Sequence, residues 1–209
     1  DGARRKAQNL HYHGALYAWE SADTGDETTP TIVSSPFGEI IPILSGLEEH
    51  HISADVAYAV WSYLRATADE GAFVQEGAEI LFETARFWAS RGHEKQDGFY
   101  HIDRVIGPDE YHESVDDNAF TNFMAQKNLV NAAVMARNAG QSVASLLGVT
   151  AEEIAQWEHI ARHMYVGIDE KSLVIEQHRG FFQLEQIDLA AFAPRTAPMD
   201  VLLGRQRIQ

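Results

Sequence analysis

The sequence contains no cysteine, which excludes disulfide bonds and metal sites built on thiolates and leaves the redox compartment undetermined. No apolar run comes close to the roughly 20 residues that a membrane-spanning helix needs, and no signal-peptide pattern opens the chain. We therefore expect a cytoplasmic protein that does not enter a membrane.

Basic side chains are scarce, with 16 lysines and arginines against 31 aspartates and glutamates and a formal net charge of -15. A nucleic-acid backbone or an anionic membrane surface requires a basic face, so neither is an expected partner. A neutral or cationic small substrate fits this balance better, although a local basic pocket could still hold an anion. Apolar residues make up 45% and charged residues 22%, an ordinary composition for a folded globular protein.

The two ends of the sequence do not have the features of natural chain termini. The chain starts at Asp1 without a methionine and enters the basic run "GARRKAQNL", and it stops at "GRQRIQ" within a polar helical pattern that lacks a cap. We expect residues 1–209 to be a single partial catalytic domain, truncated at both ends.

Helices dominate the predicted secondary structure. Their expected positions are residues 2–10, 51–67 with Ser53 as N-cap, 76–91, about twenty residues from Asn118, and a last helix that Thr150 and Glu153 open as a capping box. A long loop region occupies residues 18–49, and a small strand or hairpin is expected within residues 98–107. Strands do not alternate with helices and no repeat has a fixed period, so the expected class is all-α with function on long loops.

The stretch "VIGPDEYHESVDDNAFTN", residues 105–122, concentrates carboxylates behind a rigid turn. Pro108 restricts the backbone and directs the chain. The acidic residues sit close enough in sequence to raise one another's proton affinity, and Tyr111 or another aromatic could partly bury one of them, so that it acts as a general acid. The alternative is a set of solvated loop carboxylates with no chemical role. The carboxylates are Asp109, Glu110, Glu113, Asp116 and Asp117.

Two further stretches carry candidate site residues. Trp19 stands directly before Glu20, and a tryptophan ring beside a carboxylate can cover a sugar face while binding its hydroxyls; a core tryptophan with an exposed glutamate is the alternative. Glu49, His50 and His51 precede a helix, where a histidine more often serves the helix terminus. Neither HExxH, an EF-hand loop, a phosphate-binding loop nor GxSxG is present, so we expect no metal and no cofactor.

Taken together, these stretches resemble glycoside hydrolase family 65, the inverting disaccharide phosphorylases that act on maltose, trehalose, kojibiose and related sugars. The matching text is "GALYAWESADTGDE", "EEHHISADVAYAVW", "GAEILFETARFWASR", "VIGPDEYHESVDDNAFTN" and "APRTAPMDVLLGRQRIQ", which covers essentially the whole chain. The resemblance implies part of an (α/α)6 barrel, in agreement with the all-α expectation.

The family's general acid falls on Glu110, because related sequences of the "GPNEYE" type keep this glutamate and not the later His-Glu pair. The substrate-binding residues implied by the resemblance are Trp19, Glu20, Glu49, His51, Asn118 and Asn122. Thr121 also matches the polar run after the acid. The chain departs from the pattern at Ala18 in place of proline, at Asp117 where relatives often have asparagine, and at Phe120 where they often have tyrosine, so hydrogen bonding around the site is expected to differ.

The implied reaction needs one acid and no base, since inorganic phosphate arrives already anionic as co-substrate. Glu110 would protonate the bridging oxygen of an α-glucosidic disaccharide while phosphate attacks the anomeric carbon, giving β-glucose 1-phosphate and a free sugar. An inverting α-glucoside hydrolase and a non-catalytic carbohydrate-binding fragment remain alternatives. Family segments that contact glucose and phosphate would lie outside residues 1–209, so we expect little turnover from this chain alone. The resemblance leaves a homodimeric parent open.

Overall fold

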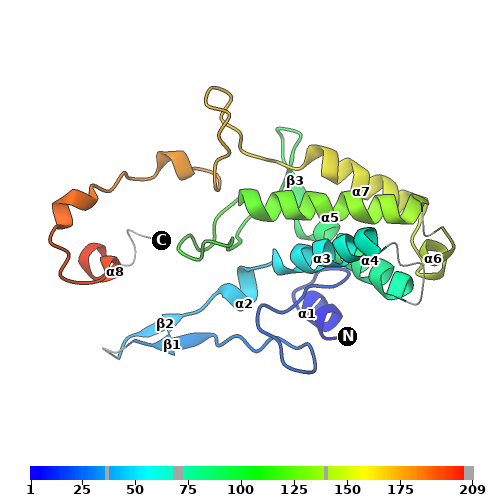
Figure 1. The fold of residues 1–209 in the computed structure, drawn as a ribbon, viewed down its shortest axis with the longest axis horizontal. Helices are drawn as coiled ribbons and strands as arrows, with labels where there is room; N and C mark the ends of the chain where they lie inside the picture. Colours follow the sequence, from blue (N-terminus) through cyan, green and yellow to red (C-terminus); the bar gives the residue numbers. More distant parts are fainter. Residues whose placement is uncertain (36–37, 68–72, 139–140, 205–209) are drawn as a thin grey trace.

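The computed structural model describes residues 1–35, 38–67, 73–138 and 141–204, and helices dominate it (Figure 1). The expected all-α class with long loops and a small β-hairpin is confirmed. In chain order the helices are α1 (Gly2–Asn9), α2 (Ser45–Glu48), α3 (Ile52–Thr67), α4 (Phe73–Arg91), α5 (Ala119–Asn138), α6 (Gln141–Leu146), α7 (Ala151–His163) and α8 (Met199–Leu203), with 3-10 turns η1 (Phe181–Gln183) and η2 (Leu189–Phe192). The strands are β1 (Ile32–Ser34), β2 (Ile40–Pro42), β3 (His93–Glu94) and β4 (Tyr100–His101).

The core lies between α3, α4, α5 and α7, which pack against one another. Small alanines on facing turns let the helices approach closely, and large rings fill the space between them. The Phe82 ring of α4 stacks on the Trp157 ring of α7 with centroids 5.9 Å apart, and both side chains are almost fully buried. The buried alanines of α5 are Ala119, Ala125, Ala132, Ala133 and Ala136.

Local sequence signals placed some helix starts correctly and missed others. The predicted capping box of α7 is present: the Glu153 amide donates to Thr150 Oγ1, and the Thr150 amide donates back to Glu153 Oε2 over 3.1 Å. The predicted N-cap at Ser53 is wrong, because α3 already begins at Ile52. The Ser53 hydroxyl is buried and accepts a hydrogen bond from the Tyr17 amide at 2.9 Å, so it ties the preceding loop to the helix instead.

The region predicted as loop between residues 18 and 49 contains structure that the sequence analysis missed. β1 and β2 form an antiparallel hairpin in which Val33 pairs with Ile41, and α2 follows. A hairpin is present near residues 98–107, as expected, but only its second strand, β4, lies within that range. β4 pairs with β3, which precedes the range at residues 93–94. The closing "GRQRIQ" pattern falls almost wholly on residues 205–209, outside the described residues.

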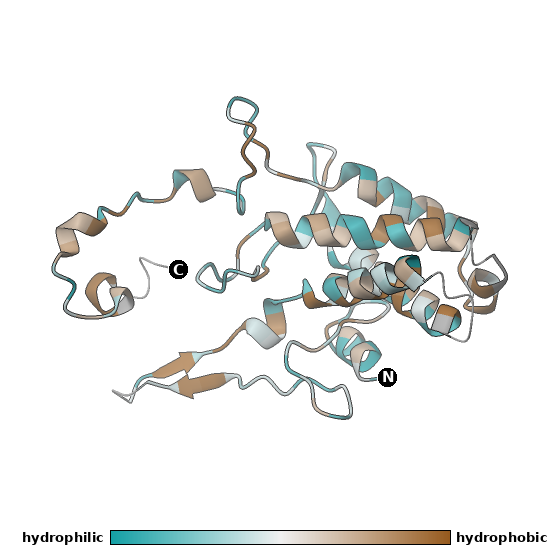
Figure 2. Cartoon of the chain, viewed as in Figure 1, coloured by the Kyte–Doolittle hydropathy of each residue, from teal (hydrophilic) through white to brown (hydrophobic). Residues whose placement is uncertain are grey.

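Two segments project from the helical bundle: the β1–β2 hairpin and an arm that follows α7, residues 164–204 (Figure 1). Figure 2 shows that both carry apolar residues, and Ile32, Ile40 and Leu173 are all more than half exposed. None of the helices in the described ranges combines the length and apolarity that crossing a membrane requires.

Candidate active site

The loop with the predicted acid, here called the acid loop (residues 105–118), runs from β4 to the start of α5. Its base is closed by a pair of backbone hydrogen bonds, from the Val105 amide to the Val115 carbonyl over 2.9 Å and in reverse over 3.0 Å. Val105 is fully buried, so the base is anchored in the core. Gly107 is required here, because a Cβ at this position would lie 2.3 Å from the Asn118 side chain.

Helix α2 clamps the acid loop through Glu48, a buried residue that the sequence analysis did not single out. The Glu48 carboxylate accepts hydrogen bonds from the Ser114 hydroxyl at 2.6 Å and from the Arg104 guanidinium at 3.1 Å. Its carbonyl accepts a third bond from the Ile106 amide at 3.0 Å. The acid loop is therefore held to the residues that directly precede Glu49.

The expectation that the loop carboxylates raise one another's proton affinity is wrong for Asp109, because hydrogen-bond donors surround it. Burial raises the pKa of Asp109, but hydrogen bonds from the Gln177 side chain and the Tyr111 amide outweigh it and hold that pKa below its ordinary value. Asp116 accepts a hydrogen bond from the Arg104 amide at 3.0 Å. Tyr111 is 64% exposed, so its ring does not bury the carboxylates.

Glu110 differs from its neighbours in the loop because the groups it interacts with, Ser45 and Glu49, lie outside the acid loop. Its Oε1 accepts a 3.4 Å hydrogen bond from the Ser45 hydroxyl at the start of α2. Its charge also acts on Glu49: burial, together with the negative charge of Glu110, raises the pKa of Glu49 above its ordinary value and outweighs the hydrogen bond from His51, which lowers it. The Glu110 side chain is exposed in this chain.

Glu49 and His51 lie together at the start of α3, as the sequence predicted, but both are buried. His51 Nε2 lies 3.3 Å from Glu49 Oε1, and Nδ1 lies 2.7 Å from Asp55 Oδ2. Burial lowers the pKa of His51, yet the two carboxylates outweigh it and raise that pKa to about 9. The imidazole is therefore protonated at neutral pH, with both N–H groups donating.

Trp19 is brought to the same place, with its ring centroid 5.8 Å from that of His51 in an edge-on arrangement. The ring of Phe120, at the start of α5, is also edge-on to the His51 ring, with centroids 5.3 Å apart. Glu20 follows Trp19 and its side chain is exposed. The contacts thus bring together residues from three separate stretches of the sequence.

Glu27 organises the Trp19–Glu20 turn and was missed by the sequence analysis. It accepts hydrogen bonds from the backbone amides of Trp19 at 2.9 Å and Glu20 at 3.2 Å. Burial raises the pKa of Glu27, but bonds from Lys6 and Thr29 and from the Trp19 amide outweigh it and lower that pKa to about 2. No local pattern marked this residue, since its partner Lys6 lies 21 positions away.

The predicted polar residues of α5 are buried and engaged with the protein. Asn118 caps the helix, its Oδ1 accepting from the Thr121 amide at 3.0 Å and the Thr121 hydroxyl at 3.1 Å. Asn122 donates to the Tyr165 carbonyl at 2.9 Å and to Asp117 at 3.3 Å. Their side-chain amides therefore hold the start of α5 and the arm in place.

Asp117 forms a buried ionic cluster behind the acid loop, with partners that the sequence did not reveal. Its carboxylate lies 2.8 Å from His101 Nδ1 and 3.1 Å from Arg179 Nε. Asp117 and His101 are fully buried side chains. Arg179 belongs to the arm, and its guanidinium lies 5.0 Å from the Tyr165 ring. The cluster thus joins β4, the acid loop and the arm.

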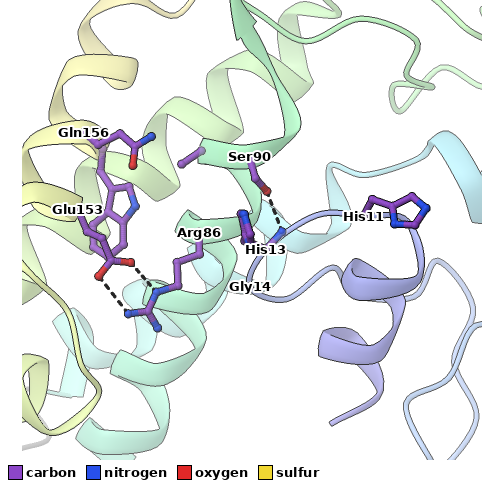
Figure 3. A pocket seen from close by; sticks show the side chains of 9 residues that line it. His11, His13, Gly14, Arg86, Ser90, Glu153 and Gln156 are labelled. Carbon is purple, nitrogen blue, oxygen red and sulfur yellow. Dashed lines mark hydrogen bonds and ion pairs between the residues drawn. The ribbon is translucent and has the colours of Figure 1, made fainter.

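A cavity of about 670 Å³ lies elsewhere, between the end of α1, α4 and α7, and none of the predicted site residues line it. Figure 3 shows Arg86 of α4 reaching Glu153 of α7 there, with Arg86 Nε 2.8 Å from Glu153 Oε1. Arg86 also pairs with Glu83, so its charge is already balanced. Within the described ranges, no three histidine, aspartate or glutamate side chains are grouped to hold a metal ion.

Comparison with known proteins identifies relatives over nearly the whole chain. The profile of the family described as "Glycosyl hydrolase family 65 central catalytic domain" matches residues 1–206. The kojibiose phosphorylase of Thermoanaerobacter brockii is 38% identical over 207 residues, which cover 95% of this chain and 27% of that protein. The kojibiose hydrolase of Flavobacterium johnsoniae is 40% identical over 161 residues, which cover 77% of this chain and 21% of that protein.

A solved structure resembles the fold throughout. A human-microbiome protein, assigned provisionally as a kojibiose phosphorylase, superposes with a TM-score of 0.81 at 25% identity, over 99% of this chain and 29% of its own. The present chain therefore spans just over a quarter of the length of the phosphorylases that it resembles, and its site residues come from that quarter alone.

Proposed function

The chain belongs to glycosyl hydrolase family 65, and on this premise we propose that it carries the general acid of an inverting phosphorylase that acts on an α-glucosidic disaccharide. Glu110 gives its proton to the bridging oxygen, and inorganic phosphate attacks the anomeric carbon from the opposite face. The products are β-glucose 1-phosphate and a free sugar. Phosphate is a co-substrate, and the reaction needs no other cofactor.

The observation that carries this proposal is the convergence of separate stretches around Glu110. Glu110 meets Ser45 at 3.4 Å and faces Glu49, Glu49 contacts His51, and His51 contacts the Trp19 ring. An acid close to a buried glutamate, a protonated histidine and an aromatic ring is suited to a sugar and an oxygen leaving group. The names of relatives such as the Thermoanaerobacter brockii enzyme support phosphorolysis as the reaction.

We propose distinct roles for the remaining residues. The Trp19 ring covers the apolar face of the glucose unit, and the exposed Glu20 carboxylate accepts from its hydroxyls. His51 supplies positive charge beside the acid. Asn118 and Asn122 serve the substrate site by holding the acid loop and α5 in place, because their amide groups are engaged with protein partners.

The proposal is tested by Glu110→Gln in the protein that carries this chain. The amide keeps the shape of the side chain and removes the transferable proton, so kcat should fall by roughly 10²–10⁴-fold with little change in KM. The measurement is the rate of β-glucose 1-phosphate release from kojibiose, trehalose, nigerose and maltose, which also identifies the substrate.

Glu113→Gln is the matched control, since Glu113 lies in the same loop and carries the same functional group. It should keep most of the activity of the wild type. A large loss in Glu113→Gln with full activity in Glu110→Gln would move the acid to Glu113, and a loss confined to KM in Glu110→Gln would make Glu110 a binding residue.

Hydrolysis is a second candidate function, favoured by the 40% identity to the kojibiose hydrolase of Flavobacterium johnsoniae. A hydrolase uses the same acid together with a carboxylate that activates water. Release of free glucose without phosphate, at a rate that added phosphate does not change, would establish hydrolysis. Strict dependence on phosphate would establish phosphorolysis.

A further inference from the structure

The Glu110 side chain depends on the backbone of the acid loop for its position. The side chain is exposed, and the hydrogen bond that its Oε1 accepts from the Ser45 hydroxyl is long, at 3.4 Å. A proton donor must nevertheless lie within hydrogen-bond reach of the oxygen that it protonates. The place of Glu110 is therefore set largely by the residues that flank it, Asp109 and Tyr111.

The Asp109 carboxylate closes the turn that carries Glu110. Its Oδ1 accepts a hydrogen bond from the Tyr111 amide at 3.1 Å, so one carboxylate joins the two residues that flank Glu110. Aspartate commonly stabilises turns in this way, by bonding to the backbone two residues further on. A turn that bonds only to itself, however, is not held at a fixed place in the molecule. The turn needs an anchor outside the acid loop.

Gln177 of the arm supplies this anchor. Its Nε2 donates to Asp109 Oδ2 over 2.9 Å. His112 Nε2 lies 3.7 Å from the same oxygen, which is beyond hydrogen-bond distance, so Gln177 is the partner that the geometry singles out. Burial raises the pKa of Asp109, but the bonds from Gln177 and the Tyr111 amide hold it below its ordinary value. The carboxylate is therefore ionised, and its bond to Gln177 is charge-assisted.

The backbone of Gln177 is bonded to the start of α5. Its carbonyl accepts hydrogen bonds from the Ala119 amide at 2.9 Å and from Asn118 Nδ2 at 3.3 Å. Two residues further along the arm, the Arg179 amide donates to the Asp116 carbonyl at 3.0 Å. Since α5 packs in the core against α3, α4 and α7, a single residue links the turn of the acid to the helical core, through its side chain on one side and its carbonyl on the other.

We propose that Gln177 is a positioning residue of the reaction, whose side chain clamps the turn that carries Glu110 to the start of α5. The proposal rests on the proposed function, in which Glu110 is the acid. Gln177 transfers no proton and needs no contact with the sugar, because it acts by holding Glu110 where the bridging oxygen arrives. Loss of this clamp should therefore slow the chemical step more than it weakens substrate binding.

The test is Gln177→Met in the protein that carries this chain, with initial rates measured on the disaccharide that the wild type cleaves fastest. Methionine has a similar length but no N–H donor, and the backbone bonds of residue 177 remain. Misplacement of a reacting group by about 1 Å can cost roughly 10²-fold, so we expect kcat to fall by about 10–100-fold with KM within about twofold. A raised KM with an unchanged kcat would overturn the proposal in favour of direct sugar binding.

Gln126→Met is the matched control. Gln126 is also partly buried, and its Nε2 donates to the Ala161 carbonyl at 2.7 Å, but this bond joins α5 to α7 and does not reach the acid loop. The variant should keep kcat within about twofold of the wild type, even where it lowers the thermal stability. An equal loss of kcat in Gln126→Met and Gln177→Met would overturn the proposal in favour of a general loss of packing.

A reciprocal exchange tests the bond itself, and it also decides the matter if Gln177→Met does not fold. Gln177→Glu places a second carboxylate against Asp109 and should lower kcat at least as much as Gln177→Met. Adding Asp109→Asn restores a hydrogen bond of opposite direction, because the introduced amide donates to the introduced carboxylate while its oxygen still accepts from the Tyr111 amide. The double variant should regain about tenfold in kcat over Gln177→Glu alone. No recovery would overturn the proposal.

A second readout does not depend on activity. The Tyr111 amide is bonded to Asp109, so its hydrogen exchange reports whether the turn stays closed. In the protein that carries this chain, exchange should become faster by about threefold or more in Gln177→Met and stay at the wild-type rate in Gln126→Met. An unchanged rate in Gln177→Met would overturn the clamp even if the enzyme is a phosphorylase. Conversely, faster exchange in a protein that lacks both phosphorolysis and hydrolysis would leave the clamp standing and would overturn the proposed function.

Discussion

At the scale of the residue, His50 and His51 are neighbours in the chain and are held in opposite protonation states. Burial, with the charge of Arg91 nearby, lowers the pKa of His50 to about 3. His51 has a raised pKa because Asp55 and Glu49 outweigh its burial. The sequence "HH" could place both before a helix, but it could not assign their charges, because these depend first on burial and then on partners such as Arg91, 41 positions away.

A single aromatic side chain provides the test of the sugar site. Trp19→Ala should raise KM by about 5–10-fold, because the loss of a stacked ring costs roughly 1 kcal/mol of binding, while kcat changes less. Initial rates of phosphorolysis over a range of sugar concentrations measure both constants. Trp61→Ala is the control, since Trp61 lies on α3 beside Arg65 and not at His51. Equal KM values for wild type and Trp19→Ala would show that Trp19 has a packing role and does not bind the sugar.

At the scale of the element, prediction succeeded where the signal is local. The twenty-residue helix from Asn118 is α5, and the capping box of α7 is present, because both depend on residues within a few positions of each other. Asp109 of the acid loop was misjudged because its partner comes from elsewhere in the chain. Gln177 reaches Asp109 across 68 positions of the sequence. The position of Glu110 was predicted, but its neighbour Glu49 was not predicted to face it.

The acid loop is held at its α5 end by the Asp117 cluster, which a substitution can probe. Asp117→Ala leaves a buried histidine and an arginine without their shared carboxylate, and breaking a buried ion pair of this kind costs about 3–5 kcal/mol. We expect a fall of that order in the free energy of unfolding of the chain, measured by urea denaturation at neutral pH.

Asp97→Ala is the matched control for this cluster, since Asp97 contacts the other ring nitrogen of the same His101 at 3.1 Å but is 44% exposed. An exposed pair contributes little because water screens it, so this variant should stay close to the wild type. If both variants lost the same small amount, the Asp117 cluster would not be what holds the loop.

At the scale of the whole molecule, the helical class could be predicted because helices are encoded by short-range periodicity. The β1–β2 hairpin and the arm could not, since their apolar residues are largely exposed in this chain and the sequence does not show what they face. The overall charge of -15 also gave little information on the site, where protonated His51 lies between two carboxylates and Arg179 pairs with Asp117.

The pH dependence of folding stability follows from the three groups with the largest shifts. His50 has a folded pKa of about 3 against an ordinary value of 6.5, so its stabilising contribution is complete above pH 6.5 and is lost as the pH falls towards 3. Glu27, at about 2 against 4.5, adds a second loss below pH 4.5. His51 has the opposite sign: its contribution is complete below pH 6.5 and is lost as the pH rises through about 9.

The free energy of unfolding should therefore be greatest near pH 6.5 and decline on both sides. Urea denaturation of the chain at pH 4, 6.5 and 9.5 measures this profile. His51→Gln should flatten the alkaline side and leave the acid side, whereas His50→Gln should flatten the acid side and leave the alkaline side, because each substitution removes one of two opposed proton linkages. A profile that rises steadily from pH 6.5 to 9.5 would contradict the protonated state of His51.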